Sequence, residues 1–138
     1  MINLLSNLNW WGVLAAFLPY TILGALWFTL FFVKPYKATL GKANQELNNK
    51  APIYIVGPMI CTFFITVAAA IFIDALNIQT MGNAIEFAFI AGIGFLVANT
   101  LNIAINPNIP HPIRYGVITG SYHLVGITIA SIIIVLMK

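Results

Sequence analysis

Four long apolar stretches, separated by short polar segments, limit what this chain can fold into. They cover residues 9–33, 52–74, 82–105 and 113–137, and each is as long as the roughly 20 residues that cross the hydrocarbon core of a bilayer. Only 7% of the residues are charged, whereas soluble domains are typically about a quarter charged. The sequence therefore predicts an all-α fold, an integral membrane four-helix transmembrane bundle that forms a single transmembrane domain over residues 1–138.

The segments between these stretches have the composition of loops. Residues 34–51 hold four lysines and one glutamate, so we expect a solvated loop, alone or with a short interfacial helix. Residues 106–112 contain three prolines, which remove amide donors and restrict the backbone, so this segment cannot be helical. The first basic residue, Lys34, follows the first stretch instead of preceding it, which argues against a cleaved signal peptide.

The positions of the basic residues predict the orientation in the membrane. Five of the six fall in the first and third connections, and only Lys138 lies on the opposite side. Cytoplasmic loops carry an excess of lysine and arginine, so we expect the polar loop 34–51 to be cytoplasmic and both termini to lie outside an inner (plasma) membrane. The five residues are Lys34, Lys37, Lys42, Lys50 and Arg114.

Composition also narrows the partners. Six basic against three acidic side chains give a net charge of +3, too sparse for a nucleic-acid surface. The expected partners are the lipid bilayer and other copies of the chain. We expect other copies because four tightly packed helices leave little room for a solute path inside one copy. We expect no cofactor and no metal, because the acidic, histidine and cysteine residues lack the spacing of a ligand set.

Small residues predict where helices approach closely. In lipid, helices associate through close contact of small side chains, and the fourth stretch carries Gly116 and Gly120 in a GxxxG pattern, while Gly24 lies in the first. The pattern is compatible with a contact inside the molecule, a contact between copies, or neither.

Polar residues at membrane depth are the candidates for function, because each must be paired or face water. In the third stretch Asn99 and Asn102 are followed by Asn106, which places the three side chains within about 60° of one another on a helix. This polar stripe either lines a path for a solute or ion, or forms hydrogen bonds that hold helices together.

The fourth stretch places Thr119, Tyr122 and His123 near the middle of the membrane. Histidine can relay protons because its ordinary pKa is near neutrality. The alternative is a buried neutral imidazole with one tyrosine or asparagine partner.

Two further candidates lie on the first and third stretches. Trp27 follows Tyr20 and Gly24 on one helical face after Pro19, an arrangement that predicts either a pocket or ordinary packing. Glu86 falls on another face of the third helix than Asn99. It either couples the site to protons or cations, or reaches the outer membrane interface.

Several of these segments resemble a known family. They are Gly24-Ala25-Leu26-Trp27-Phe28, Phe32-Val33-Lys34, Asn99 and Gly120-Ser121-Tyr122-His123-Leu124. Together they resemble the domain-of-unknown-function family 1761, small bacterial membrane proteins with four spans, over nearly the whole chain. Phe28 stands where the family more often has a tyrosine, and the polar loop is rich in asparagine. The resemblance implies the fold and the membrane location but no activity.

We therefore expect small-solute transport or binding at an intramembrane polar site, with an unknown ligand. The alternative is a structural or accessory membrane subunit, and a small membrane enzyme is less favoured because no nucleophile and base occur at a useful spacing. The expected site residues are Trp27, Asn99, Asn102, Thr119, Tyr122 and His123, with His123 and Glu86 as candidates for proton coupling.

Overall fold

Each of the four apolar stretches forms a helix long enough to cross a membrane. In the computed structural model, which describes residues 2–45, 47 and 51–138, these spans are Trp10–Phe31, Ile53–Ala75, Met81–Ala104 and Pro112–Leu136. Every span begins and ends within two residues of the range expected from the sequence. The predicted all-α fold with four membrane-spanning helices is confirmed. Lys50, one of the lysines used to predict the orientation, lies outside the described residues.

Two of the spans change their helical geometry part-way along. In the first span, α1 continues into a π-helical turn, η2, where the amide of Phe32 donates to the carbonyl of Trp27 over 2.8 Å. The third span contains a second π-helical turn, η3, between α4 and α5. Such turns are uncommon and are often found at functional sites. The elements are η1 (Ile2–Asn7), α1 (Trp10–Leu26), η2 (Trp27–Phe31), α2 (Val33–Thr39), α3 (Ile53–Ala75), α4 (Met81–Ala91), η3 (Gly92–Val97), α5 (Ala98–Ala104) and α6 (Pro112–Leu136).

Local chemistry explains where three of the spans begin. The side chain of Asn9 accepts a hydrogen bond from the amide of Gly12 over 3.1 Å, and Thr80 accepts one from Asn83 over 3.2 Å. Both side chains occupy the N-cap position, where they satisfy amides that have no partner within the helix. The last span begins with Pro112, which has no amide hydrogen to leave unsatisfied there.

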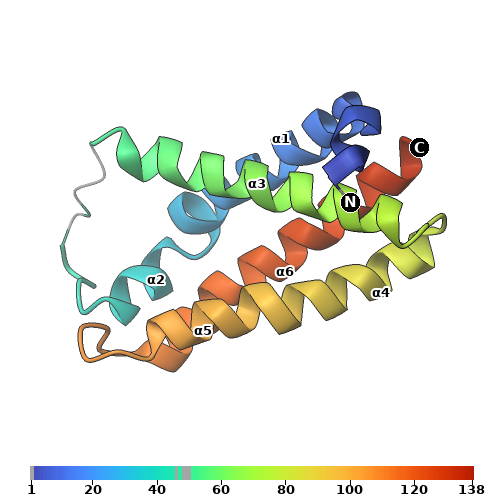
Figure 1. The fold of residues 1–138 in the computed structure, drawn as a ribbon. Helices are drawn as coiled ribbons and strands as arrows, with labels where there is room; N and C mark the ends of the chain where they lie inside the picture. The colour runs from blue at the N-terminus through green and yellow to red at the C-terminus, as the bar shows by residue number, and fades with distance from the viewer. Residues whose placement is uncertain (1, 46, 48–50) are drawn as a thin grey trace.

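The last helix, α6, is the centre of the bundle. It packs against α1 and α3 on one side and against the whole third span on the other, while α1 and α3 also pack against each other (Figure 1). Small residues allow the close approach to the third span, because a Cβ on Gly120 would lie 3.1 Å from Val97 and one on Gly116 would overlap Leu101. The GxxxG pair therefore makes a contact within the molecule.

The two ends of the bundle are held by different contacts. At the end where both termini lie (Figure 1), the side chain of Asn9 donates to the carbonyl of Met137 over 2.6 Å, and Lys138 forms an ion pair of 2.7 Å with Asp74. At the opposite end, the short helix α2 lies against the start of α6 through the rings of Tyr36 and Tyr115. Burial, with the nearby Tyr115, raises the pKa of Tyr36 to about 12.

Candidate functional site

A tyrosine from α1 and a histidine from α6 meet inside the bundle. Tyr20 is completely buried, and its hydroxyl oxygen lies 3.0 Å from Nδ1 of His123. The same hydroxyl lies 3.3 Å from the backbone carbonyl of His123, to which it can donate. If the hydroxyl donates to that carbonyl, the ring nitrogen can donate in turn to the hydroxyl oxygen. The imidazole predicted as a candidate site residue thus has a partner on another helix.

The neighbouring tyrosine on α6 is bonded to a third helix. The hydroxyl of Tyr122 lies 3.3 Å from Oγ1 of Thr62 in α3. Thr62 gives its only hydroxyl proton to the carbonyl of Pro58 over 2.8 Å, so Tyr122 is the donor between the two hydroxyls. The ring of Tyr122 also packs against those of Tyr20 and Phe28, with centroids 5.5 Å and 5.4 Å away. We call Tyr20, Thr62, Tyr122 and His123 the central cluster.

Two glycines make room for the rings of the central cluster. A Cβ on Gly126 would overlap the ring of Tyr20, and a Cβ on Gly24 would lie 2.9 Å from the hydroxyl of Tyr122. Both distances are far below ordinary van der Waals contact, so neither position accepts a larger residue unless the tyrosine moves. Gly24, predicted as a packing residue, therefore lies against the central cluster.

Trp27 and Thr119 lie beside the central cluster, and each already has a hydrogen-bond partner. The indole nitrogen of Trp27, the first residue of η2, donates to the carbonyl of Ile118 in α6 over 3.0 Å. The hydroxyl of Thr119 donates to the carbonyl of Tyr115, one turn earlier in its own helix, over 2.8 Å. Both side chains thus donate to backbone carbonyls. The Trp27 bond joins the first span to α6, and the Thr119 bond stays within α6.

The two asparagines of the third span are not part of this cluster. Asn99 and Asn102 lie on α5, and both residues are exposed on the side of the helix that does not pack against α6. Neither amide makes a hydrogen bond to another described residue. The structure therefore brings Trp27, Thr119, Tyr122 and His123 together and leaves Asn99 and Asn102 on an outer face of the molecule.

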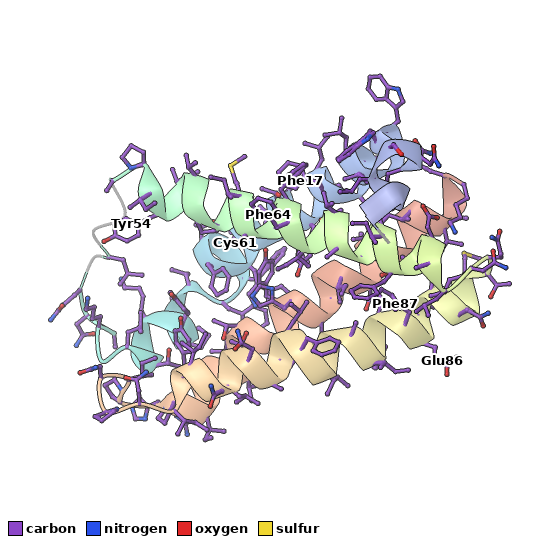
Figure 2. All side chains as sticks on the ribbon, in the orientation of Figure 1. Phe17, Tyr54, Cys61, Phe64, Glu86 and Phe87 are labelled. Carbon is purple, nitrogen blue, oxygen red and sulfur yellow. The ribbon has the colours of Figure 1, made fainter. Side chains whose placement is uncertain are left out.

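Glu86 lies on the same span, nearer the end that holds the termini. It is exposed and points away from the bundle, whereas its neighbour Phe87 points inward toward Phe72 of α3 (Figure 2). No described cation lies within ion-pair distance of its carboxylate. An open hollow of about 300 Å³ at this end is lined by Leu76, Ile78, Asn83, Glu86, Phe87 and Ile90.

Comparison with known proteins assigns the chain to a family. The model of a family described as "Protein of unknown function (DUF1761)" matches residues 11–135. The chain belongs to the DUF1761 family. No curated protein and no solved structure matches it. The matched range includes the whole central cluster and the outward face of the third span, so both regions lie within the part that this DUF1761 protein shares with its family.

In this DUF1761 protein, sequence reasoning found half of the central cluster. Tyr122 and His123 were singled out, but Thr62 was not, and Tyr20 was noted only as part of a helical stripe. A buried histidine needs a partner, and Tyr20 carries a hydroxyl in the middle of a span. The sequence therefore contained a signal for their pairing. Thr62 gave no comparable signal, because threonine often bonds within its own helix, as it does here to Pro58.

The chemistry available to this DUF1761 protein follows from these groups. The central cluster offers two phenols, one imidazole and one hydroxyl in two hydrogen-bonded pairs, Tyr20 with His123 and Tyr122 with Thr62, and holds no charged nucleophile. Within the described part of the chain, no three histidine, cysteine, aspartate or glutamate side chains are grouped closely enough to hold a metal ion. The third span offers amides and a carboxylate, which are suited to binding polar solutes or cations.

Proposed function

We propose that this DUF1761 protein binds or transports a small polar solute and that it does so as an assembly of several copies. The observation that supports this most strongly is the exposure of Asn99 and Asn102 on the outward face of the third span. A polar group left unsatisfied in the hydrocarbon core costs several kcal/mol. Asn99, five residues inside the end of the span at Ala104, therefore needs a partner from outside the single chain, and Asn102 lies on the same face nearer that end.

A second copy of the same face is a suitable partner. An amide side chain both donates and accepts hydrogen bonds, so an asparagine can pair with the same asparagine across a symmetric contact. Interhelical bonds of this kind stabilise helix association in membranes by about 0.6 to 2 kcal/mol each. Amides that face each other across such a contact can also replace the water around a polar solute, which gives the assembly a binding site that one copy lacks.

Glu86 adds a carboxylate to the same span, nearer its other end and on another face of the helix than Asn99. Its carboxylate is exposed and lies about three turns of helix from Asn99 along the same span. Intramembrane carboxylates often belong to ion or proton pathways. In the assembly, Glu86 attracts a cation or proton near the end that holds the termini, and the asparagines contact the solute toward the opposite end of the span. His123, bonded to Tyr20, is the second candidate for proton coupling.

The distribution of charge supports a cytoplasmic location for the end that carries α2. The described basic residues at that end have no acidic partner, whereas Lys138 at the other end is neutralised by Asp74. By the positive-inside rule this orientation places both termini outside the inner (plasma) membrane. Labelling of single cysteines placed at Ala43 and at Asn77 with a membrane-impermeant maleimide in intact cells tests it, after replacement of Cys61 by serine. Only the variant at Asn77 is expected to react.

Reconstitution into liposomes tests the transport proposal. The probes are proton flux, followed with an entrapped pH-sensitive dye, and the entry of urea or glycerol, followed by light scattering. We expect the native protein to accelerate at least one of these fluxes and the double variant Asn99→Leu with Asn102→Leu to remove the acceleration. The control, Ile103→Leu, changes an exposed apolar residue on the same helix and should leave the flux intact.

A structural or accessory subunit is the second candidate, and the central cluster favours it. Tyr20, Tyr122 and His123 find their partners within the chain, as polar groups do when they only hold helices together. In that case the outward asparagines pair with a different membrane protein. Flux indistinguishable from empty liposomes, together with a monomer of the purified chain in lipid, would support this candidate and reject the first.

A further inference from the structure

One end of the molecule carries basic residues without acidic partners. Lys34 and Lys37 lie on α2, Lys42 follows it, and Arg114 lies in the first turn of α6. Among the described residues none of these four side chains has a carboxylate within 4.0 Å, while the ion pair of Lys138 and Asp74 lies at the other end. The field at the first end is therefore positive.

Contacts between α2 and the start of α6 hold these charges at one end of the molecule. The amide of His111 donates to the carbonyl of Thr39 at the end of α2 over 3.3 Å, and Thr39 itself is buried. One turn away, the rings of Tyr36 and Tyr115 pack with centroids 5.7 Å apart. Lys37 follows Tyr36 in the chain, and Arg114 precedes Tyr115. The lysines of α2 and the arginine of α6 thus belong to a packed unit and not to a loose loop.

A hollow opens on this surface beside Arg114. Its volume is about 300 Å³, and it is lined by Pro110, His111, Pro112, Ile113 and Arg114. The residues that line it include an arginine and a histidine beside two prolines. An arginine binds phosphate oxygens in a bidentate manner, so the hollow has a polar group for a phosphate and an apolar wall beside it.

An exposed apolar ridge continues from the hollow along α6. Ile113 and Val117 are 58% and 54% exposed, and residues four apart share one face of a helix. This ridge leads from the charged end toward the middle of the membrane. A molecule that binds with a charged head at Arg114 and a hydrocarbon tail along Ile113 and Val117 fits both parts of the surface, whereas a free phosphate fits only the first.

We propose that this surface binds an anionic phospholipid. The phosphate lies against Arg114 and His111, Lys34 and Lys37 attract the negative headgroup, and an acyl chain lies along the ridge of Ile113 and Val117. Basic pockets at the membrane surface bind anionic headgroups in this way, with about 1 kcal/mol for each lysine or arginine. The site is independent of any solute pathway through the third span.

Lipid binding to the full-length protein tests this proposal. Purified protein in a neutral detergent is titrated with phosphatidylglycerol or with phosphatidylcholine, and bound lipid is counted by native mass spectrometry while the thermal unfolding midpoint is recorded. We expect phosphatidylglycerol to bind and raise the midpoint and phosphatidylcholine to do neither. Arg114→Gln should weaken binding about fivefold, and Lys34→Gln with Lys37→Gln should weaken it further, because each cation contributes about 1 kcal/mol.

A matched variant and a second anion separate this site from general charge effects. Lys138→Gln removes one cation at the opposite end and should leave phosphatidylglycerol binding unchanged. Equal binding of both lipids, or equal losses in Arg114→Gln and Lys138→Gln, would mean that the cations only orient the chain, and the proposal would be rejected. A midpoint shift with inorganic phosphate equal to that with the lipid would also reject it in favour of a free-anion site. Val117→Gln tests the contact with the acyl chain. It should weaken the binding of phosphatidylglycerol and leave any effect of inorganic phosphate unchanged.

Discussion

The central cluster and the outward face of the third span both place polar side chains in apolar helices, but only the central cluster supplies partners for them. Tyr20 and His123 are bonded across α1 and α6, and Tyr122 is bonded to Thr62 of α3. Asn99 and Asn102 have no partner in the described part of the chain and lie exposed. Residue type alone does not separate these two cases.

The difference shows which polar residues serve the fold and which require something else. The two hydrogen bonds of the central cluster join three helices within one chain, and the loss of either leaves a group unsatisfied. An amide on the membrane-facing side contributes nothing to the folded single chain and becomes favourable only when another molecule covers it. We therefore expect substitutions in the central cluster to change stability and substitutions on the outward face to change assembly.

The largest effect should come from Gly126→Ala. The added methyl group overlaps the ring of Tyr20, which is completely buried and bonded to His123, so the ring cannot move without losing that bond. Overpacking of a buried site typically costs 1–3 kcal/mol, and we expect about 3 kcal/mol here. The measurement is the free energy of unfolding in detergent micelles. Gly94→Ala is the control, because no atom of the described part of the chain lies within 4 Å of the added methyl group.

Tyr20→Phe should have the next largest effect. It keeps the ring but removes the hydroxyl, which leaves Nδ1 of the part-buried His123 without this partner. Such a loss costs about 1–3 kcal/mol. Ser131→Ala provides a matched comparison, because the Ser131 hydroxyl is also completely buried but has no hydrogen-bond partner among the described residues. That variant should be as stable as the native protein. Equal losses in the two variants would show that the bond to His123 contributes nothing.

Asn99→Leu with Asn102→Leu should leave the single chain as stable as before and weaken its self-association. Two interhelical hydrogen bonds of about 0.6 to 2 kcal/mol each imply about a tenfold or larger loss of association. The measurement is the fraction of oligomers in lipid bilayers at several protein-to-lipid ratios. Asn99→Ser with Asn102→Ser retains hydrogen-bonding groups and should keep part of the association. An unchanged oligomer fraction in the leucine variant would show that the asparagines do not take part in the contact between copies.

The sequence predicted the spans well because their signal is local. A stretch of 20 or more apolar residues has few other stable structures, and the end of each helix follows from prolines, asparagines or charges nearby. The central position of α6 was not predictable in this way, because small and apolar residues occur on every side of it and no single face marks its neighbours. Tyr20 and His123 are separated by 103 residues, so their pairing depends on that packing.

The π-helical turns explain another limit of sequence reasoning. The angle between Glu86 and Asn99 was estimated from 100° per residue, but η3 lies between them and has a wider turn. The relative direction of the two side chains therefore differs from that of a regular α-helix. Asn99 and Asn102 both lie in α5, after this turn, so their common face was predictable even though its direction relative to α6 was not.

The smallest expected effect concerns two carboxylates. One has a partner within the chain, as the polar groups of the central cluster do, and the other has no described partner, as on the outward face of the third span. Asp74 is half-buried and paired with Lys138 at 2.7 Å, which joins the ends of α3 and α6, while Glu86 is exposed and has no described cation beside it. Asp74→Asn should lower the free energy of unfolding by up to about 1 kcal/mol, as partly exposed ion pairs do, and added salt should reduce the difference. Glu86→Gln should leave the free energy of unfolding unchanged. An equal loss in both variants would show that Glu86 has a stabilising partner within one chain, and the third span would then resemble the central cluster more than its exposed face indicates.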